Sequence, residues 1–325
     1  MMKALLAATL CAGWALHGIS PAQSQAYPNK PIKLVVPFPP GGSVDVQARI
    51  VSDRLGAVLG QSVVVENHGG GAGGSNAAKM VAAAEPDGYT LLITPGGALT
   101  SGPAVYKNIG YDPAKVFAPV GLLLETPQVI SVHPDLPVKS LAEVAAYAKA
   151  NPGKISWGTQ GFGTSPHLLL ELFKLEEGID IVHVPYRGTA PMLAAAVAGQ
   201  VQMVADPMTS SLPHIQGGRL RPLAIPGRER SSKLPDVPTA REAGYPKFVA
   251  PFWIGVVAPA ETPTAVIDKL NAALGQTLSA PEMRQRFAAL GAETRIGTPQ
   301  DFGKMLAQEL ALWTGVVKAA NITVE

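Results

Sequence analysis

Four loops in the sequence share a layout that suits the binding of a small anion. In each loop a β-forming run leads into a turn rich in glycine or proline, and a helix start follows; the loops span residues 38–45, 67–76, 158–167 and 186–191. The first backbone N–H groups of a helix have no intrahelical partner and carry a partial positive charge. Glycine has no Cβ, so the backbone of such loops can approach a ligand closely. The repetition predicts a shared cleft for a carboxylate or a phosphate, although tight turns alone would explain any single loop.

Few ionisable side chains accompany these loops. Arg187 follows a strand end, where it would contact a ligand or form an ion pair between lobes. Asp206 ends an apolar strand, and a carboxylate there must be paired because burial is costly, so it would cap the next turn or bind a ligand amine or hydroxyl. His167 lies in the first turn after a glycine loop, facing a ligand or packing between lobes. The loop aromatics would form apolar walls or pack on their own helices: Phe38, Phe162 and Tyr186.

Nucleotide binding is poorly supported. Gly69, Gly71 and Gly74 fit the G-x-G-x-x-G pattern, but five of these six positions are glycine, so the pattern is easily met by chance. The acidic residue expected about 20 positions later is missing, since Asp87 lies in a Pro-Asp-Gly turn. The chain contains no G-K-[ST] sequence for a phosphate loop.

Catalytic and metal sites are equally unsupported. The chain has no G-x-S-x-G sequence. Ser165 and His167 lie two positions apart in one helical turn, so they do not face each other as a triad with Asp206 would require. The histidines after residue 26 show no metal-ligand spacing, and His183 alternates within a strand as a core or sheet-face residue does. We expect no enzyme activity, no metal and no cofactor.

Composition narrows the class of protein. The chain has 325 residues, which suggests about two domains at roughly 150 residues per domain. Its 26 basic and 24 acidic residues leave a formal charge of +2, without the dense basic field that nucleic acid requires. Apolar residues make up 47% of the chain, which is too much for disorder and enough for a sizeable core.

The first 26 residues read as a secretory signal peptide. Lys3 is followed by an apolar stretch over residues 4–18, and the small residues Ser24 and Ala26 precede a cleavage site before Tyr27. The stretch is shorter than the roughly 20 apolar residues that span a membrane. The single cysteine, Cys11, lies within it, so the mature chain has no disulfide and no thiolate. We expect a periplasmic protein without stable membrane insertion.

Strands and helices alternate along the mature chain. The predicted strands cover residues 31–36, 62–66, 89–93, 129–132, 155–157, 180–184, 201–205, 223–225 and 253–257. The predicted helices cover residues 44–59, 76–84, 141–150, 164–175, 190–198, 263–278, 281–290 and 299–320. Repeated strand–loop–helix units indicate parallel or mixed sheets with helices on both faces. Two turn-rich segments, residues 118–128 and 226–251, are candidate crossings between two lobes.

The sequence resembles the extracytoplasmic solute receptors of tripartite tricarboxylate transporters, the Bug receptors. The resemblance covers nearly the whole mature chain. It rests on the motifs YPNKPIKLVVPFPPGG (27–42), VVVEN (63–67), GAGG (71–74), PDGYTLL (86–92), HVPYRGTAP (183–191), LPDVPTAREAG (234–244) and ELALW (309–313). The resemblance implies an α/β, two-lobed type II periplasmic-binding-protein fold, with mixed sheets flanked by helices and a ligand cleft between the lobes. Residues 27–125 and 251–325 would form a discontinuous first lobe, and residues 126–250 an inserted second lobe.

The resemblance further implies hinge closure on a small carboxylate, such as a di- or tricarboxylate, an aromatic acid or an amino acid. A monomeric receptor would deliver this ligand to membrane transporter subunits. In the family, backbone N–H groups and waters hold the carboxylate at positions matching Phe38, Pro40, Gly41 and Gly42 and, in the second lobe, Gly163, Thr164, Ser165 and His167. The Asp206 position also matches a pocket residue. Together with other loop residues, the candidate ligand site is Phe38, Pro40, Gly41, Gly42, Thr94, Phe162, Gly163, Thr164, Ser165, His167, Tyr186, Arg187 and Asp206.

The chain departs from the family pattern in or near this expected pocket. Arg187 replaces a lysine, Asp206 precedes Pro207 in place of asparagine, and His68 and Gly69 replace a basic residue and a proline. Residues 159–162 replace smaller, serine-rich forms. The family's ligands therefore do not carry over directly to this chain.

Two alternatives stay open: a sensor that hands its ligand to a signalling protein such as a sensor kinase, and an exported enzyme on the same fold.

Overall fold

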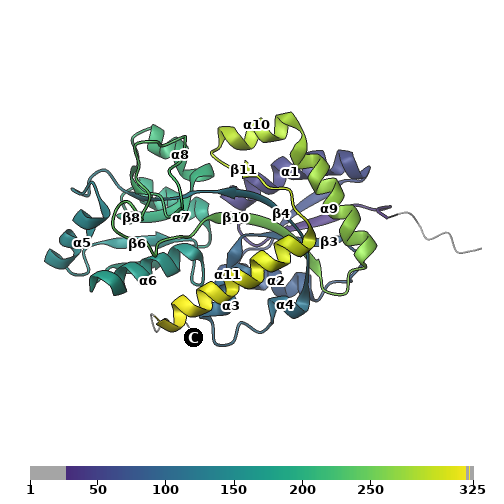
Figure 1. Ribbon diagram of the computed structural model, residues 1–325, viewed down its shortest axis with the longest axis horizontal. Coiled ribbons are helices and arrows are strands. Elements are labelled where there is room, and N and C mark those ends of the chain that lie inside the picture. Colours follow the sequence, from purple (N-terminus) through teal and green to yellow (C-terminus); the bar gives the residue numbers. More distant parts are fainter. Residues whose placement is uncertain (1–26, 320–321, 323–325) are drawn as a thin grey trace, which may run out of the picture.

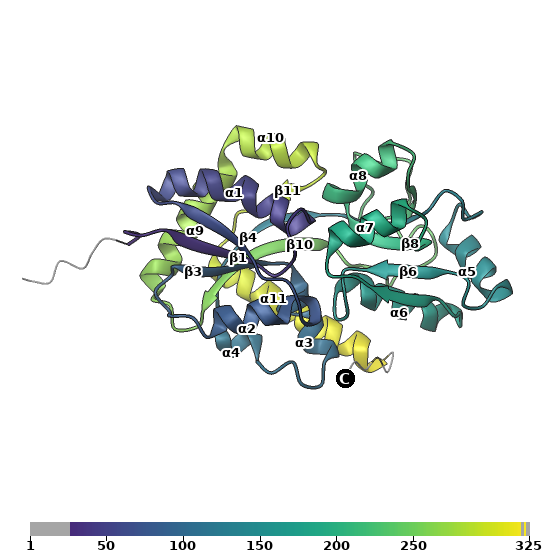
Figure 2. The same cartoon turned by 180° about the vertical axis from the view of Figure 1, so that it is seen from behind.

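The computed structural model describes residues 27–319 and residue 322. The signal-peptide prediction for residues 1–26 lies outside this part of the chain. Two α/β lobes lie side by side, and each holds one mixed sheet with helices on both faces (Figures 1 and 2). The predicted two-lobed α/β fold class is confirmed.

The first lobe contains a six-stranded sheet in the order β11-β4-β10-β3-β1-β2. Its strands are β1 (Ile32–Val36), β2 (Val63–Asn67), β3 (Thr90–Thr94), β4 (Phe117–Thr126), β10 (Phe252–Pro259) and β11 (Glu293–Thr294). β1 pairs in parallel with β2 and β3, whereas β10 is antiparallel to both β3 and β4. Segments from both ends of the described chain thus share one sheet.

Alternating apolar side chains attach helices to both faces of this sheet. The helices are α1 (Ser43–Leu59), α2 (Ser75–Ala82), α3 (Ser101–Val105), α4 (Pro113–Val116), α9 (Thr264–Ser279), α10 (Pro281–Ala289) and α11 (Pro299–Ala319), with single 3₁₀ turns η1 (Ala72–Gly74) and η2 (Gly96–Ala98). In β1, Leu34 is buried in a cluster with residues of α1 and α9. The next residue, Val35, is buried in a cluster with residues of α2 and α11. Successive side chains of β1 thus pack on opposite faces of the sheet, as the geometry of a strand requires.

The second lobe contains a five-stranded sheet in the order β7-β6-β8-β5-β9. Its strands are β5 (Gln128–Val132), β6 (Ser156–Thr159), β7 (Val182–Pro185), β8 (Met203–Pro207) and β9 (Arg221–Ala224). Its helices are α5 (Leu141–Ala150), α6 (Ser165–Glu177), α7 (Thr189–Val197) and α8 (Met208–Gln216). β6 pairs in parallel with β7 and β8, so the loops after these strands open at one edge of the sheet.

The first predicted crossing segment is mostly strand and not turn, although the chain does leave the first sheet within it. Residues 118–128 were expected to be turn-rich, but β4 is a ten-residue strand and the chain passes to β5 at Pro127. Val120 and Leu123 are fully buried, and their packing outweighs the turn preference of Pro119. Proline has no N–H to donate to a neighbouring strand. Pro119 is tolerated because β11 pairs only with Leu124 and Glu125, at the other end of β4, so no strand needs a donor on the outer edge of β4 beside Pro119.

The C-terminal helix α11 packs on both lobes. Phe302, near its start, is buried in the first lobe beside Trp253. Trp313, near its end, is buried in the core of the second lobe. Figure 1 shows α11 running along the first lobe with its end toward the second. The helix therefore ties the lobes together in addition to the chain crossings.

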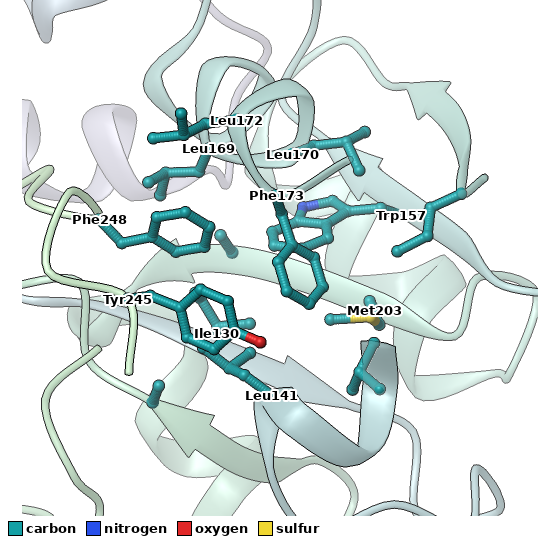
Figure 3. Packing of buried hydrophobic residues seen from close by; sticks show 14 of the residues in the cluster. Ile130, Leu141, Trp157, Leu169, Leu170, Leu172, Phe173, Met203, Tyr245 and Phe248 are labelled. Carbon is teal, nitrogen blue, oxygen red and sulfur yellow. The ribbon is translucent and has the colours of Figure 1, made fainter. Parts of the chain in front are cut away.

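The core of the second lobe is built around aromatic side chains. Phe173 is fully buried and lies among Trp157, Tyr245 and Phe248 (Figure 3). Its ring centroid is 5.3 Å from that of Tyr245 and 5.8 Å from that of Phe248, and both contacts are edge-to-face. Such pairs stabilise the core beyond their buried area. The irregular segment that carries Tyr245 and Phe248 is held on the lobe by this cluster.

Truncating Phe173 to alanine should lower the free energy of unfolding by about 3–5 kcal/mol, because it leaves a cavity and removes the edge-to-face contacts. Chemical denaturation measures the change. Leu175→Ala on the same helix is the control, because that side chain is 55% exposed and its loss should cost little. Equal destabilisation by the two substitutions would contradict the packing described.

Candidate ligand-binding site

Two adjacent cavities lie between the lobes. The inner cavity is small, with a volume of about 40 Å³, and the outer one has a volume of about 490 Å³. Phe38 and Gln160 line both. The other residues of the inner cavity are Gly42, Ser43, Val44, Pro95, Gly96, Gly97, Ser101, Thr164, Ser165, Pro166, Thr189, Pro251, Phe252, Trp253, Glu309 and Trp313. Both lobes and the second chain crossing therefore contribute to the walls.

Three helices begin at the inner cavity. Residues at the starts of α1, α6 and α7 line it, and these helices have 17, 13 and 9 residues. Their N-cap residues are Gly42, Thr164 and Gly188, and no side chain caps any of the three. The first N–H groups of Ser43, Ser165 and Thr189 thus remain available, whereas Pro166 in α6 and Pro191 in α7 have no N–H to offer. The three dipoles place partial positive charge at the cavity. This arrangement suits an anion with several acceptor atoms.

The inner cavity offers an anion no cationic side chain. Among the described residues that line it, Glu309 is the single ionisable one. Its Oε2 accepts hydrogen bonds from Trp253 Nε1 at 2.8 Å and Thr100 Oγ1 at 2.9 Å. The hydrogen bonds lower the pKa of Glu309, but burial raises it by more, so the negative charge is disfavoured. Attraction of an anion must come from the backbone.

The loop before α1 is held by a buried carboxylate. Asp45 Oδ2 accepts the Gly41 N–H at 2.9 Å, and Asp45 Oδ1 accepts Asn67 Nδ2 at 2.9 Å. Arg49 forms an ion pair with Asp45 at 2.9 Å. Hydrogen bonds from Arg49, Gly41 and Asn67 outweigh desolvation and hold the pKa of Asp45 below its usual value. The loop backbone is fixed, and the Gly41 N–H is already used inside the protein.

Asp206 occupies the corresponding position in the second lobe. It is fully buried, and its carboxylate accepts hydrogen bonds from Gln160 Nε2 at 2.9 Å, from Ser210 Oγ and from Thr189. Desolvation raises the pKa of Asp206 to about 7, although these three hydrogen bonds lower it. Asp206 lies outside the lining of both cavities and reaches the inner one through Gln160 and Thr189, which do line it. Its visible role is to hold those two side chains.

The two histidines near the cleft form a stacked pair. The ring centroids of His167 and His183 are 4.6 Å apart, and Phe162 packs edge-on against both. His167 Nδ1 accepts the Gly163 N–H at 3.4 Å, and His183 Nε2 is 2.7 Å from Thr159 Oγ1. Burial is the main cause that lowers the pKa of His167 to about 3 and that of His183 to about 4. The pair is neutral near pH 7 and shapes the loop before α6.

Direct hydrogen bonds join the lobes on two sides of the inner cavity. Ser43 Oγ and Gln47 Nε2 on α1 lie 3.1 Å and 2.9 Å from Thr209 Oγ1 on α8. Ser101 Oγ donates to the Gly163 carbonyl at 2.7 Å. In this structure the lobes therefore meet around the cavity.

The structure brings together about half of the predicted site residues. Four line the inner cavity: Phe38, Gly42, Thr164 and Ser165. Phe38 and three more line the outer cavity: Phe162, Tyr186 and Arg187. Six line neither cavity: Pro40, Gly41, Thr94, Gly163, His167 and Asp206. The polar groups among these six are engaged in the bonds described above, or, for Thr94, in a hydrogen bond from its hydroxyl to the Pro95 carbonyl.

Sequence reasoning missed several lining residues. Trp253, Glu309 and Trp313 come from β10 and α11, which follow no glycine loop. The motif ELALW contains two of them, but nothing in its spacing places it at a cleft. Gln160 was noticed only as a departure from the family pattern. Thr189 could have been predicted as a site residue, because it is the first residue of α7 and directly follows Gly188, as in the other glycine loops that lead into a helix.

Comparison with known proteins decides the family. Residues 47–322 match the tripartite tricarboxylate transporter family receptor. The chain belongs to this receptor family. It is 39% identical to protein BugT of Bordetella pertussis, with 92% of each chain covered.

The receptor's fold is also shared with solved structures. An R. palustris protein with adipate is 37% identical, with a TM-score of 0.87, over 91% of this chain and 99% of that one. MatC from Rhodopseudomonas palustris, with bound malate, is 35% identical, with a TM-score of 0.86, over 90% and 100% of the chains. The predicted Bug-receptor resemblance and the type II periplasmic-binding-protein fold are confirmed.

The described residues contain neither a membrane-spanning helix nor a cluster of metal ligands. No helix within residues 27–319 has the length and apolar character needed to cross a membrane. Within the same part of the receptor, no three His, Cys, Asp or Glu side chains are grouped as metal ligands would be.

The raised pKa of Asp206 predicts a pH-dependent stability. The folded protein keeps the Asp206 proton up to about pH 7, whereas the unfolded chain releases it near the ordinary value of 3.8. Between these values the folded state binds more protons, so the free energy of unfolding falls as pH rises. The shift sets an upper limit of about 4 kcal/mol on this loss. Denaturation of the wild type and of Asp206→Asn from pH 4.5 to 8 measures it.

The comparison with Asp206→Asn is needed because the histidine pair acts in the opposite direction. His167 and His183 stay neutral in the fold, so acidification below about pH 6.5 protonates the unfolded chain and lowers stability. The wild-type advantage over Asp206→Asn should shrink as pH rises. An advantage that is constant, or that grows with pH, would contradict the buried, proton-retaining state of Asp206.

Proposed function

We propose that this receptor captures a small carboxylate between its lobes and releases it unchanged to membrane transporter subunits. The observation that carries the proposal is the meeting of three uncapped helix starts at one cavity that has no cationic side chain. Backbone N–H groups in that arrangement match the lone pairs of a carboxylate. The two relatives with adipate and malate hold ligands of the same class.

Binding without catalysis is part of the proposal. The family is one of receptors, and the inner cavity places no hydroxyl or thiol nucleophile beside a general base within the described residues. Glu309 already accepts two hydrogen bonds that hold it in the wall. The cavity is suited to holding an acid, and nothing in its lining activates a bond.

The same proposal includes the receptor's organisation and location. Residues 1–26 direct export to the periplasm, where the mature receptor acts as a monomer. Residues 27–125 and 251–325 form one lobe, and residues 126–250 form the other. The strands of the two sheets support this division, except that β4 of the first sheet ends one residue later, at Thr126. Hinge closure would bring the α1 start toward the α6 and α7 starts around the ligand.

A carboxylate ligand should raise the melting temperature of the mature protein. Binding to the folded state alone adds about 2.7 kcal/mol when the ligand is present at 100 times its Kd, which corresponds to several degrees. Differential scanning fluorimetry with a panel of mono-, di- and tricarboxylates, amino acids, sugars and NAD measures the shift. A shift with sugars or NAD and none with any acid would rule the proposal out.

Removing one backbone donor should weaken binding of the acid that the panel selects. Ser43 is the first residue of α1, a position that accepts proline, so Ser43→Pro deletes an N–H at the cavity while keeping the helix. The matched control, Ser43→Ala, deletes the hydroxyl and keeps the N–H. We expect Ser43→Pro to bind roughly 10-fold more weakly than Ser43→Ala by calorimetry, since the lost hydrogen bond is to a charged group. Equal affinities in two variants of similar melting temperature would show that this N–H does not contact the ligand.

A further inference from the structure

The Gln160 side chain lies where the two cavities adjoin, and it lines both. It belongs to the loop between β6 and α6, and the α6 start that follows it also lines the inner cavity. A ligand that places its carboxylate at the helix starts would therefore have its neighbouring atoms beside this amide.

The orientation of the Gln160 amide is fixed from behind. Its Nε2 donates to Asp206 Oδ1 at 2.9 Å and approaches the Ala205 carbonyl at 3.3 Å. Both partners belong to β8, and neither lines a cavity. The Ala205 carbonyl can only accept a hydrogen bond, whatever the protonation state of Asp206. An acceptor on β8 selects the amide orientation in which Nε2 points toward β8, and Oε1 then points away from β8.

Gln160 Oε1 has no partner. The atom is buried, and no hydrogen-bond donor of the described residues reaches it. A buried acceptor without a donor is destabilising, and such atoms in native proteins are few. Gln160 lines both cavities, so a group bound there is the donor that a small movement of the side chain would bring to Oε1.

We propose that Gln160 Oε1 accepts a hydrogen bond from a hydroxyl or ammonium group of the bound acid. The receptor then selects carboxylates that carry such a donor near the carboxylate and discriminates against otherwise equal acids that lack it. The inference rests on the proposed carboxylate-binding function and specifies its ligand class. Discrimination arises because an acid without the donor would leave a buried acceptor unpaired on closure.

Two matched sets of probes test the selection by isothermal titration calorimetry on the mature protein. Succinate, malate and aspartate share one skeleton and carry hydrogen, hydroxyl or ammonium at one carbon; phenylacetate, mandelate and phenylglycine do the same on an aromatic skeleton. For the skeleton that binds, we expect the wild type to prefer a donor-bearing acid by roughly 10-fold or more. The better of the hydroxy and amino acids identifies which donor is used.

Gln160→Met keeps the side-chain length and removes the acceptor, so it should abolish this preference, mainly by weakening the donor-bearing acid. Gln216→Met, the same substitution on an exposed position of α8, should keep the wild-type ratio. Gln160→Ala provides a second variant if the methionine variant does not fold.

Three results would overturn the inference, and they separate it from the proposed function. Equal wild-type affinities within a set that binds, or an unchanged ratio in the Gln160 variants, would overturn the role of Gln160 while carboxylate binding stands. Failure of all six acids and of the wider carboxylate panel to bind would overturn both.

Discussion

The receptor's site depends on backbone N–H groups that have no partner inside the protein. A helix start must satisfy these groups with a capping side chain, water or a ligand. In α1, α6 and α7 no side chain takes that role, and all three starts meet at one cavity without a lysine, arginine or histidine in its lining. A binding site built this way takes its charge preference from the fold, and its lining side chains are left to set shape and selectivity.

Such a site works only if the loops that present the N–H groups are rigid, and buried carboxylates provide that rigidity in both lobes. Asp45 holds the loop before α1 through Gly41 and Asn67, with Arg49 balancing its charge. Asp206 holds the side chains of Gln160 and Thr189 without any cation, so its charge is costly and its pKa rises. One lobe thus uses an ion pair for the task, whereas the other uses neutral donors alone.

The sequence predicted the elements better than the cavity. Apolar runs and glycine stops located most strands and helices within a few residues, because local propensity and burial agreed there. β4 was missed because Pro119 and Gly121 signal a turn, whereas the pairing of β4 with β10 is a long-range fact. The loops were located as well, but a loop sequence does not reveal which N–H groups are used internally, as for Gly41, or which side chains lie behind the wall, as for Asp206. Glu309 and Trp313 reach the cavity only because α11 returns across both lobes.

That return of α11 also bears on how occupancy of the cavity could be communicated. Glu309 lines the cavity and is bonded to Trp253 on the crossing strand and to Thr100 before α3, whereas Trp313, one turn later, is buried in the core of the second lobe. A change of lobe angle must therefore either move Trp313 out of that core or carry α11 with the second lobe and strain the Glu309 contacts. The same helix forms a wall of the ligand cavity and a tie between the lobes, so the energy of closure and the energy of binding cannot be independent in this fold.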